Sequence, residues 1–131
     1  MCDIRGIGID MCLISRMENE KNSSLLLRKC FTEEEAAYLT SKGVSMAQSM
    51  AGLWAAKEAV LKALGKGITV PMRDVEIWHD DLGAPKVRLS GRARELVPQG
   101  ECLVSIAHEG DYAAAFCVLT APQPAAGADS R

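Results

Sequence analysis

Four residues between positions 51 and 62 have the spacing of a single helix face. At 3.6 residues per turn, Glu58 and Lys62 lie one turn apart on the stripe that also holds Ala51 and Ala55. A carboxylate beside an ammonium suits a phosphate-rich ligand with a divalent cation, because hard cations take oxygen ligands. The small alanines would leave room for that ligand. A solvated Glu–Lys pair on a surface helix explains the same spacing without any ligand, and this segment alone leaves both interpretations open.

A basic, glycine-rich segment, Gly65-Lys66-Gly67, follows this helix face. Its glycines would let the backbone approach a phosphate closely, and Lys66 would add a positive charge there. Lys57 is harder to interpret, since it lies among apolar residues on another face of the helix. Its stem could run along the apolar surface with the ammonium at the helix edge, which is a structural role.

Two further polar residues stand at the ends of strand-like segments. Asp10 follows the apolar run 4–9, and His108 ends the run 102–108. Taken singly, Asp10 could be a loop cap and His108 a satisfied core or turn histidine. Together with Glu58 and Lys62 they form a candidate set for chemistry on a phosphate-containing substrate.

The elements that must position these residues mix helices and strands without a regular βαβ repeat, which predicts the α+β class. Thr32 and Glu35 form the sequence signature of a capping box at a helix start. Expected helices cover about 13–27, 33–42, 45–64 and 90–96. Expected strands cover 4–9, 75–78, 86–89, 102–108 and 113–119, the second and third forming a hairpin around 81–85. Two glycines in the first strand indicate that another element packs close to its backbone.

Composition excludes several classes of protein. The 131 residues fit one domain, expected over 1–120, with a disordered tail over 121–131 that is poor in bulky residues. A net charge of −2 and six aromatic residues speak against a nucleic-acid-binding face. The five cysteines are widely spaced without a C-x-x-C pair, so a disulfide scaffold or zinc site is not expected. No apolar run approaches 18 residues and no secretion signal is found, so we expect no membrane span and a cytoplasmic location.

Four sequence blocks occur in a family-like order and spacing. They are Gly8-Ile9-Asp10 with Arg16, Phe31-Thr32-x-x-Glu35, Trp54-Ala-Ala-Lys57-Glu58-Ala-x-x-Lys62-Ala-x-Gly65, and Val104-Ser105-Ile106-Ala107-His108. This pattern resembles the holo-[acyl-carrier-protein] synthases, the short bacterial 4′-phosphopantetheinyl transferases, over about residues 4–119. The resemblance implies their fold, a small antiparallel sheet packed against a long central helix. It also implies Mg²⁺-dependent transfer of the phosphopantetheine arm of coenzyme A to a serine of apo acyl carrier protein. Adenosine 3′,5′-bisphosphate would leave, and the pathway would be fatty acid biosynthesis.

The resemblance also implies roles for individual residues. Asp10 and Glu58 match the family's metal-binding carboxylates, and with Lys62 they form the catalytic set. The residues implied in coenzyme binding are Lys57, Lys62, Gly65, Lys66, Gly67, Pro85, Ser105 and His108. Lys57 could instead help to order the site, and Pro85 could belong to a plain hairpin turn. The serine proton could go to Glu58 or to a metal-activated water, and the sequence does not choose between them.

A basic segment and two departures from the family pattern complete the prediction. Arg16 matches the family pattern, and with Lys21, Arg28 and the neighbouring Lys29 it suits an acidic carrier protein, although a solvated helix face explains the last three. The resemblance further implies a homotrimer with sites at the subunit interfaces. Leu53 stands where the family often has a basic residue, and Glu109 where many relatives have a small hydroxyl residue. A non-catalytic coenzyme- or nucleotide-binding module is the main rival interpretation, but such a module would be expected to lose Asp10, Glu58 or Lys62.

Overall fold

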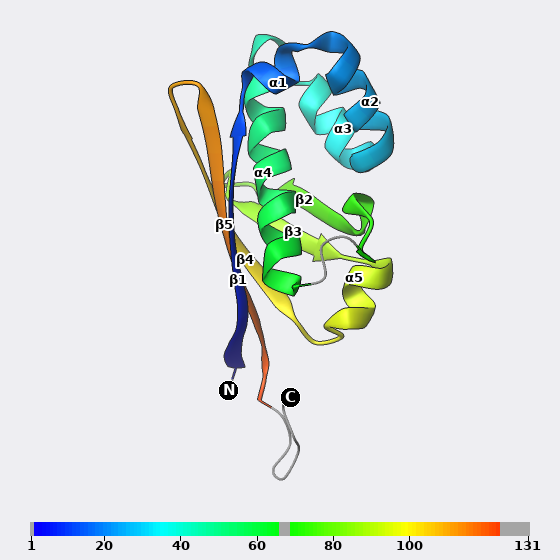
Figure 1. Cartoon of the computed structure of the whole chain (residues 1–131), viewed down its shortest axis with the longest axis vertical. Helices are drawn as coiled ribbons and strands as arrows, with labels where there is room; N and C mark the ends of the chain where they lie inside the picture. The colour runs from blue at the N-terminus through cyan, green and yellow to red at the C-terminus, as the bar shows by residue number, and fades with distance from the viewer. Residues whose placement is uncertain (1, 66–68, 124–131) are drawn as a thin grey trace.

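One long helix lies along one face of a three-stranded sheet in the computed structural model, which describes residues 2–65 and 69–123 (Figure 1). The helix is α4 (Met46–Leu64), and the sheet contains β1 (Cys2–Leu13), β4 (Glu101–Glu109) and β5 (Tyr112–Pro122). Three short helices, α1 (Ser15–Glu18), α2 (Glu20–Cys30) and α3 (Glu33–Thr40), lead from β1 to α4 through the 3₁₀ turn η1 (Gly43–Ser45). After α4 come η3 (Met72–Asp74), β2 (Val75–His79), β3 (Pro85–Leu89) and α5 (Gly91–Leu96). This arrangement confirms the predicted α+β class.

The three strands of the main sheet are antiparallel, in the order β1-β5-β4. β5 therefore separates β1 from β4, and each of these two lies at an edge of the sheet within the described chain. Asp10 pairs with Ala115, and His108 pairs with Ala113. Strands β2 and β3 form a separate antiparallel hairpin, as predicted. The predicted site residues thus lie at two different edges of one sheet.

Small residues allow α4 to pack closely on the sheet. A Cβ atom at Gly6 would collide with the backbone carbonyl of Ala63, and one at Gly8 with that of Ala59. The two glycines of β1 are therefore explained by the approach of α4, which confirms the expectation from the sequence. Ala51 and Ala55 are also fully buried. The prediction that these two alanines leave room for a ligand was wrong, because the space above them is filled by the protein core.

The predicted helix signals have the expected geometry. Thr32 Oγ1 accepts a hydrogen bond from the Glu35 N–H, and Glu35 Oε1 accepts one from the Thr32 N–H, so the capping box at the start of α3 is complete. Gly65 ends α4 with a φ of 75°, a left-handed conformation that glycine adopts without steric cost.

Several element bounds differ from the prediction. β1 continues to Leu13, so Asp10 lies within a strand and not at its end. α3 ends at Thr40, two residues before the predicted bound. β5 continues through Pro122 and pairs with the start of β1, so residues 121 and 122 of the expected tail belong to the sheet. Strand pairing overrides the low hydrophobicity of this segment because β1 supplies backbone partners. None of the helices in the described ranges is long and apolar enough to cross a membrane.

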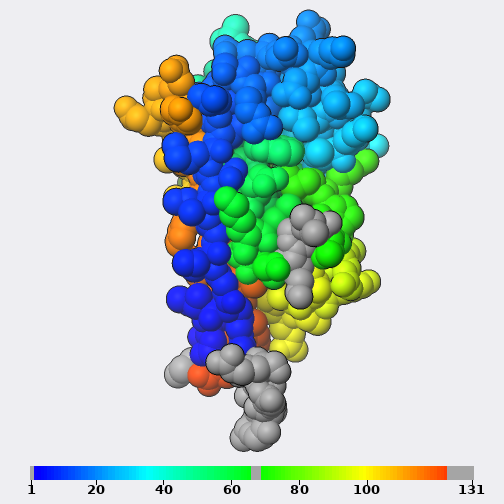
Figure 2. All heavy atoms as spheres, in the orientation of Figure 1, coloured from blue at the N-terminus to red at the C-terminus, as the bar shows by residue number. Residues whose placement is uncertain are grey.

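The face of the sheet that points away from α4 is strongly apolar. Ile7, Ile9 and Met11 of β1 are each more than half exposed on it, as is Leu103 of β4, and Phe116 of β5 is 40% exposed. Figure 2 shows the side chains of β1 standing along one side of the molecule. Monomeric proteins rarely expose such a continuous apolar surface, so this face has the character of an interface.

Candidate active site

Asp10 and Lys62 meet where β1 passes α4. The Lys62 ammonium donates hydrogen bonds to Asp10 Oδ1 at 3.1 Å and to the Ile9 carbonyl at 2.9 Å. The side chain of Lys62 is 54% exposed and that of Asp10 is 19% exposed, so the pair faces solvent on one side. The strand backbone thus fixes the position of the Lys62 ammonium, which can face an anion that enters from solvent.

Glu58 lies one turn before Lys62 and is half-buried. Burial raises the pKa of its carboxyl group, the negative charge of Asp10 raises it further, and Lys62 and Arg16 lower it. Within the described residues the Glu58 carboxylate makes no hydrogen bond and no ion pair. Two neighbouring carboxylates, one of them without a partner, favour the binding of a cation between them.

The residues at this edge fit a Mg²⁺ ion. Mg²⁺ is commonly held by one or two carboxylates, while substrate phosphates and waters supply its other ligands. Asp10 and Glu58 are the residues that would hold it. Among the described residues no group of three or more His, Cys, Asp or Glu side chains is arranged to hold a metal. The donor set therefore fits a metal that binds together with a phosphate-containing substrate.

A basic segment borders this edge. The Arg16 guanidinium lies over the Trp54 ring, 5.9 Å from its centroid, and its charge acts on both Glu58 and Cys12. Arg16 is exposed on α1, and Lys21 and Arg28 are exposed on α2. The three predicted carrier-binding cations are thus accessible, and Arg16 is directly beside the carboxylate group.

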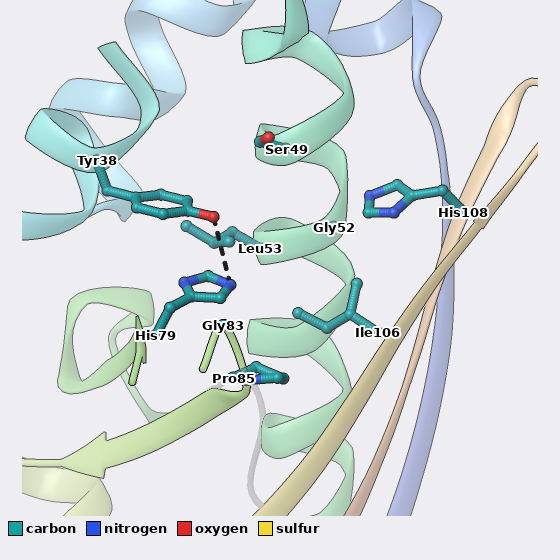
Figure 3. A pocket seen from close by; sticks show the side chains of 9 residues that line it. All are labelled: Tyr38, Ser49, Gly52, Leu53, His79, Gly83, Pro85, Ile106 and His108. Carbon is teal, nitrogen blue, oxygen red and sulfur yellow. Dashed lines mark hydrogen bonds between the residues drawn. The ribbon is translucent and has the colours of Figure 1, made fainter. Parts of the chain in front are cut away.

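A second group of predicted residues lines a cavity of about 220 Å³ on another side of α4 (Figure 3). His108 and Ile106 come from β4, Pro85 and Gly83 from the β2–β3 hairpin, and the α4 residues lie between them. We call this the histidine pocket; its lining residues are Tyr38, Ser49, Gly52, Leu53, His79, Gly83, Pro85, Ile106 and His108.

Gly52 and a backbone carbonyl position His108. The His108 Nε2–H donates to the Gln48 carbonyl at 3.1 Å, which assigns the proton to this nitrogen. A Cβ at position 52 would lie 2.8 Å from Nε2, so only glycine allows the ring to lie this close to the helix. The other ring nitrogen, Nδ1, stays available to a ligand.

The opposite wall of the histidine pocket was not predicted. Tyr38 and His79 stack with ring centroids 4.5 Å apart, and the Tyr38 hydroxyl lies 3.5 Å from His79 Nε2. Burial lowers the pKa of His79, and the nearby Lys42 ammonium lowers it further, against the opposing effect of Asp80. One feature of the sequence could have indicated this wall. His79 is one of only two histidines, and it stands just before the turn that carries Gly83 and Pro85.

The two groups of residues are separated within one chain. Asp10 lies on β1 and His108 on β4, with β5 between them, so their strands are about 10 Å apart. On α4, Gly52 faces His108, and Glu58 comes six residues later, which places it about 120° away around the helix. The structure therefore brings Asp10, Glu58, Lys62 and Arg16 together, and it brings His108 and Pro85 together, but it does not join these two groups.

Lys57 does not belong to either group. Its side chain is completely buried, and its ammonium donates to Glu35 Oε1 at 2.6 Å and to the Val75 carbonyl at 2.5 Å. The prediction that Lys57 binds the coenzyme is therefore overturned, because the ammonium has no exposed surface. Its alternative role, ordering the elements around the site, agrees with a contact that ties α4 to α3 and β2.

The remaining predicted coenzyme residues lie elsewhere. Ser105 points to the open apolar face of the sheet, because alternate residues of a strand face opposite sides, and so it does not accompany His108. Ser105 and His108 thus lie on opposite faces of β4, and a role of Ser105 in coenzyme binding stays a prediction. Gly65 is exposed at the end of α4. Lys66 and Gly67 lie outside the described residues.

Comparison with known proteins assigns this arrangement to a family. The sequence model of the 4′-phosphopantetheinyl transferase superfamily matches residues 6–117. A holo-[acyl-carrier-protein] synthase of Nocardia farcinica is 39% identical over 129 residues, covering 91% of this chain and 89% of that protein. Among solved structures, an acyl carrier protein synthase of Mycobacterium tuberculosis superposes with a TM-score of 0.74 at 35% identity, covering 92% of this chain and all of that one. A holo-(acyl-carrier-protein) synthase of Bacillus anthracis in complex with CoA (3′,5′-ADP) gives a TM-score of 0.77 at 33% identity, covering 91% of this chain and 98% of that one.

Proposed function

We propose that this chain acts on coenzyme A and an apo acyl carrier protein. The premise is that it belongs to the 4′-phosphopantetheinyl transferase superfamily and, within it, to the holo-[acyl-carrier-protein] synthases. The serine hydroxyl of the carrier attacks the phosphorus that bears the pantetheine arm. A phosphorus–oxygen bond forms to serine, the pyrophosphate bond breaks, and adenosine 3′,5′-bisphosphate leaves.

The observation that carries this proposal is the meeting of Asp10, Glu58 and Lys62 at one exposed edge. Attack on a pyrophosphate is slow because its oxygens carry negative charge, so a catalyst must position the serine and offset that charge. The Lys62 ammonium faces solvent and is fixed by Ile9 and Asp10, so it can face the bridging and leaving oxygens without reorganising.

The carboxylates have two tasks in this proposal. Asp10 and Glu58 would hold a Mg²⁺ ion, which when bound offsets charge on the phosphate oxygens. Burial and Asp10 raise the pKa of Glu58, which makes its carboxylate a better proton acceptor than an ordinary surface glutamate. The serine proton would go to Glu58 or, with Mg²⁺ bound at this carboxylate, to a metal-activated water.

We further propose a cyclic homotrimer in which each active site is shared by two subunits. The β1 edge of one subunit, with Asp10 and Glu58, would face the β4 edge of the next, with His108. Such a head-to-tail contact closes into a ring when the rotation between subunits fits. The apolar open face supports this arrangement, since Ile9 is 63% exposed and Leu103 is 62% exposed in the single chain. Burying this face in the ring would remove that surface from water.

Arg16, Lys21 and Arg28 are proposed to bind the acidic carrier. All three are exposed, and the charge of Arg16 acts on Glu58, so a carrier bound at these cations would bring its serine toward the carboxylates. We place the enzyme in the cytoplasm, in agreement with five free cysteines. Supply of carrier protein for fatty acid synthesis is the proposed pathway.

The test mixes the protein with coenzyme A, Mg²⁺ and apo acyl carrier protein, and measures carrier mass together with the nucleotide released. The proposal predicts one phosphopantetheine added per carrier and an equal amount of adenosine 3′,5′-bisphosphate. A carrier whose acceptor serine is replaced by alanine serves as the control and should gain no mass. If coenzyme A binds but no carrier is modified at any Mg²⁺ concentration, the chain is a coenzyme-binding module and not a transferase.

The shared site has a separate test. Glu58→Gln and His108→Ala subunits are each expected to form trimers with little activity, because every site lacks one required group. Co-expression of the two variants produces mixed trimers in which some interfaces combine an intact Glu58 with an intact His108. Partial recovery of activity is the expected result. Mixed trimers that stay as inactive as the parents would place both residues in the same subunit's site.

A further inference from the structure

Trp54 lies between the core and the exposed cations of α1, and the proposed function gives it no role. Its indole ring is half-buried on α4 and packs against Phe31, with ring centroids 6.3 Å apart and planes inclined by 39°. The Arg16 guanidinium carbon lies over the same ring, 5.9 Å from its centroid. Trp54 thus contacts a buried ring and an exposed charge at the same time.

The side of Trp54 that faces the core is firmly held. Phe31 is only 1% exposed, and the Lys57 ammonium lies 5.1 Å from the centroid of the Phe31 ring. Lys57 is itself bound to Glu35 at 2.6 Å in the interior. Trp54 also belongs to the middle of a 19-residue helix. Because side chains in a close-packed interior keep their rotamers on average, the indole ring has a fixed place and orientation.

Arg16 has less support of its own. It is exposed and belongs to α1, a helix of only four residues. Within residues 2–65 and 69–123 its guanidinium makes no hydrogen bond and no ion pair, while its backbone carbonyl accepts a hydrogen bond from Asn22 Nδ2 at 2.9 Å. A guanidinium is attracted to the negative face of an aromatic ring. The indole of Trp54 is therefore the contact that restricts the Arg16 side chain.

This contact leaves Arg16 ready for an anionic partner beside the catalytic edge. Contact with a ring face uses no N–H group, so the five donors of the guanidinium stay available to a carboxylate. Glu58 follows Trp54 by one turn on the same face of α4, and the charge of Arg16 acts on it. The ring therefore holds the cation close to the carboxylates that the carrier serine must reach.

We propose that Trp54 is a positioning residue for the acidic carrier protein: its ring orients Arg16 in advance, so that the guanidinium meets a carboxylate of the carrier without first being ordered. This inference rests on the proposed function and on the part that Arg16 has in it. Ordering a side chain before binding removes a cost from the binding step. Trp54 then contributes to carrier affinity through Arg16, and not through a contact of its own with the carrier.

The first test measures transfer kinetics with the full-length enzyme, varying the apo carrier at saturating coenzyme A. Trp54→Leu should raise the KM for the carrier about three- to tenfold, because the guanidinium loses its aromatic contact and must be ordered on binding. Its kcat and its KM for coenzyme A should stay within about twofold of the wild type. Trp54→Phe keeps an aromatic face and should restore the KM for the carrier to within about twofold.

A double-mutant cycle separates positioning from direct contact. In an Arg16→Gln background, Trp54→Leu should change the KM for the carrier by less than about 1.5-fold, since no guanidinium is left to position. The matched background is Lys21→Gln, which removes another exposed cation of the same basic segment. There the full effect of Trp54→Leu should remain.

A measurement on the wild type keeps the inference testable if the leucine variant fails to fold. Side-chain NMR should show the Arg16 Nε–H group more restricted in motion than that of Arg28, another exposed arginine of this segment. Equal mobility of the two groups would overturn the inference.

Three kinetic results would also overturn it. They are a rise below about threefold in Trp54→Leu, an equal rise in the Arg16→Gln background, and an Arg16→Gln variant with the wild-type KM for the carrier. The second of these would mean that the indole binds the carrier directly. Absence of transfer by the wild type would instead contradict the proposed function.

Discussion

The Lys57→Met variant should unfold far more readily than the wild type, while the residues of the active site stay unchanged. The Lys57 ammonium donates to Glu35 Oε1 and to the Val75 carbonyl, and both charged side chains are fully buried. Glu35 also accepts hydrogen bonds from the backbone N–H groups of Thr32 and Ile77. Methionine keeps an unbranched side chain, one atom shorter than that of lysine, and removes its charge. The carboxylate of Glu35 then stays buried without a counter-charge, and the Val75 carbonyl loses a donor.

The expected loss follows from these contacts. Removing one partner of a buried ion pair costs about 3–5 kcal/mol, because an uncompensated charge is left in the interior. Burial also lowers the pKa of Lys57 against the opposing effect of Glu35, so the pair is already costly to keep charged. Neutralising the second partner removes that cost. The Lys57→Met/Glu35→Gln double variant should therefore be more stable than Lys57→Met alone, and a double-mutant cycle measures the difference.

The assay is urea unfolding followed by circular dichroism, at one fixed protein concentration because the stability of an assembly depends on concentration. Lys62→Met is the matched control on the same helix. Its ion pair with Asp10 is exposed, so it should lose less than about 1 kcal/mol of stability. Its transferase activity should fall by about 100-fold or more, since Lys62 faces the substrate phosphates. A loss below about 1 kcal/mol for Lys57→Met, or a double variant no more stable than the single one, would refute the reasoning.

Three further outcomes are expected. Glu58→Gln should lower kcat by about 100-fold or more in the transfer assay. It should not lower the melting temperature, because burial and Asp10 already disfavour the charged form of Glu58. Substantial remaining activity would remove Glu58 from the site. Ile9→Glu should shift sedimentation from trimer to monomer and abolish transfer, because a charge on the open apolar face opposes association; an unchanged trimer would show that this face is not the interface. Wild-type stability should fall as pH drops below 6.5, because the unfolded chain takes up a proton at His79 that the folded chain resists. His79→Gln should flatten that slope in unfolding measurements between pH 7.5 and 5.5, and an unchanged slope would contradict the buried, uncharged state of His79.

Local signals predicted most of the fold. The Thr32–Glu35 capping box, the glycine end of α4 and the β2–β3 hairpin each depend on residues close together in the chain, and all three were confirmed. Strand lengths were underestimated because pairing is a long-range property. Residues 121 and 122 form strand only because the start of β1 lies opposite them.

The site was predicted only in part, because some of its contacts join residues that are far apart in the chain. Asp10, Glu58 and Lys62 could be grouped because helix spacing and family motifs point to the same residues. The side chain of Lys57 could not be placed, since its partner Glu35 is 22 residues away and was interpreted only as a helix cap. Tyr38 and His79 come from two segments that meet only in the folded chain, so no spacing rule connects them.

The most direct test of the central claim is the intact mass of apo acyl carrier protein after incubation with coenzyme A, recorded across a Mg²⁺ titration for wild type and for Asp10→Asn. We predict one phosphopantetheine added per carrier by the wild type, with a rate that rises with Mg²⁺, and no measurable addition by Asp10→Asn at any Mg²⁺ concentration. A wild type that leaves the carrier mass unchanged, or an Asp10→Asn variant that modifies it at the wild-type rate, would contradict the assignment of this edge as the active site.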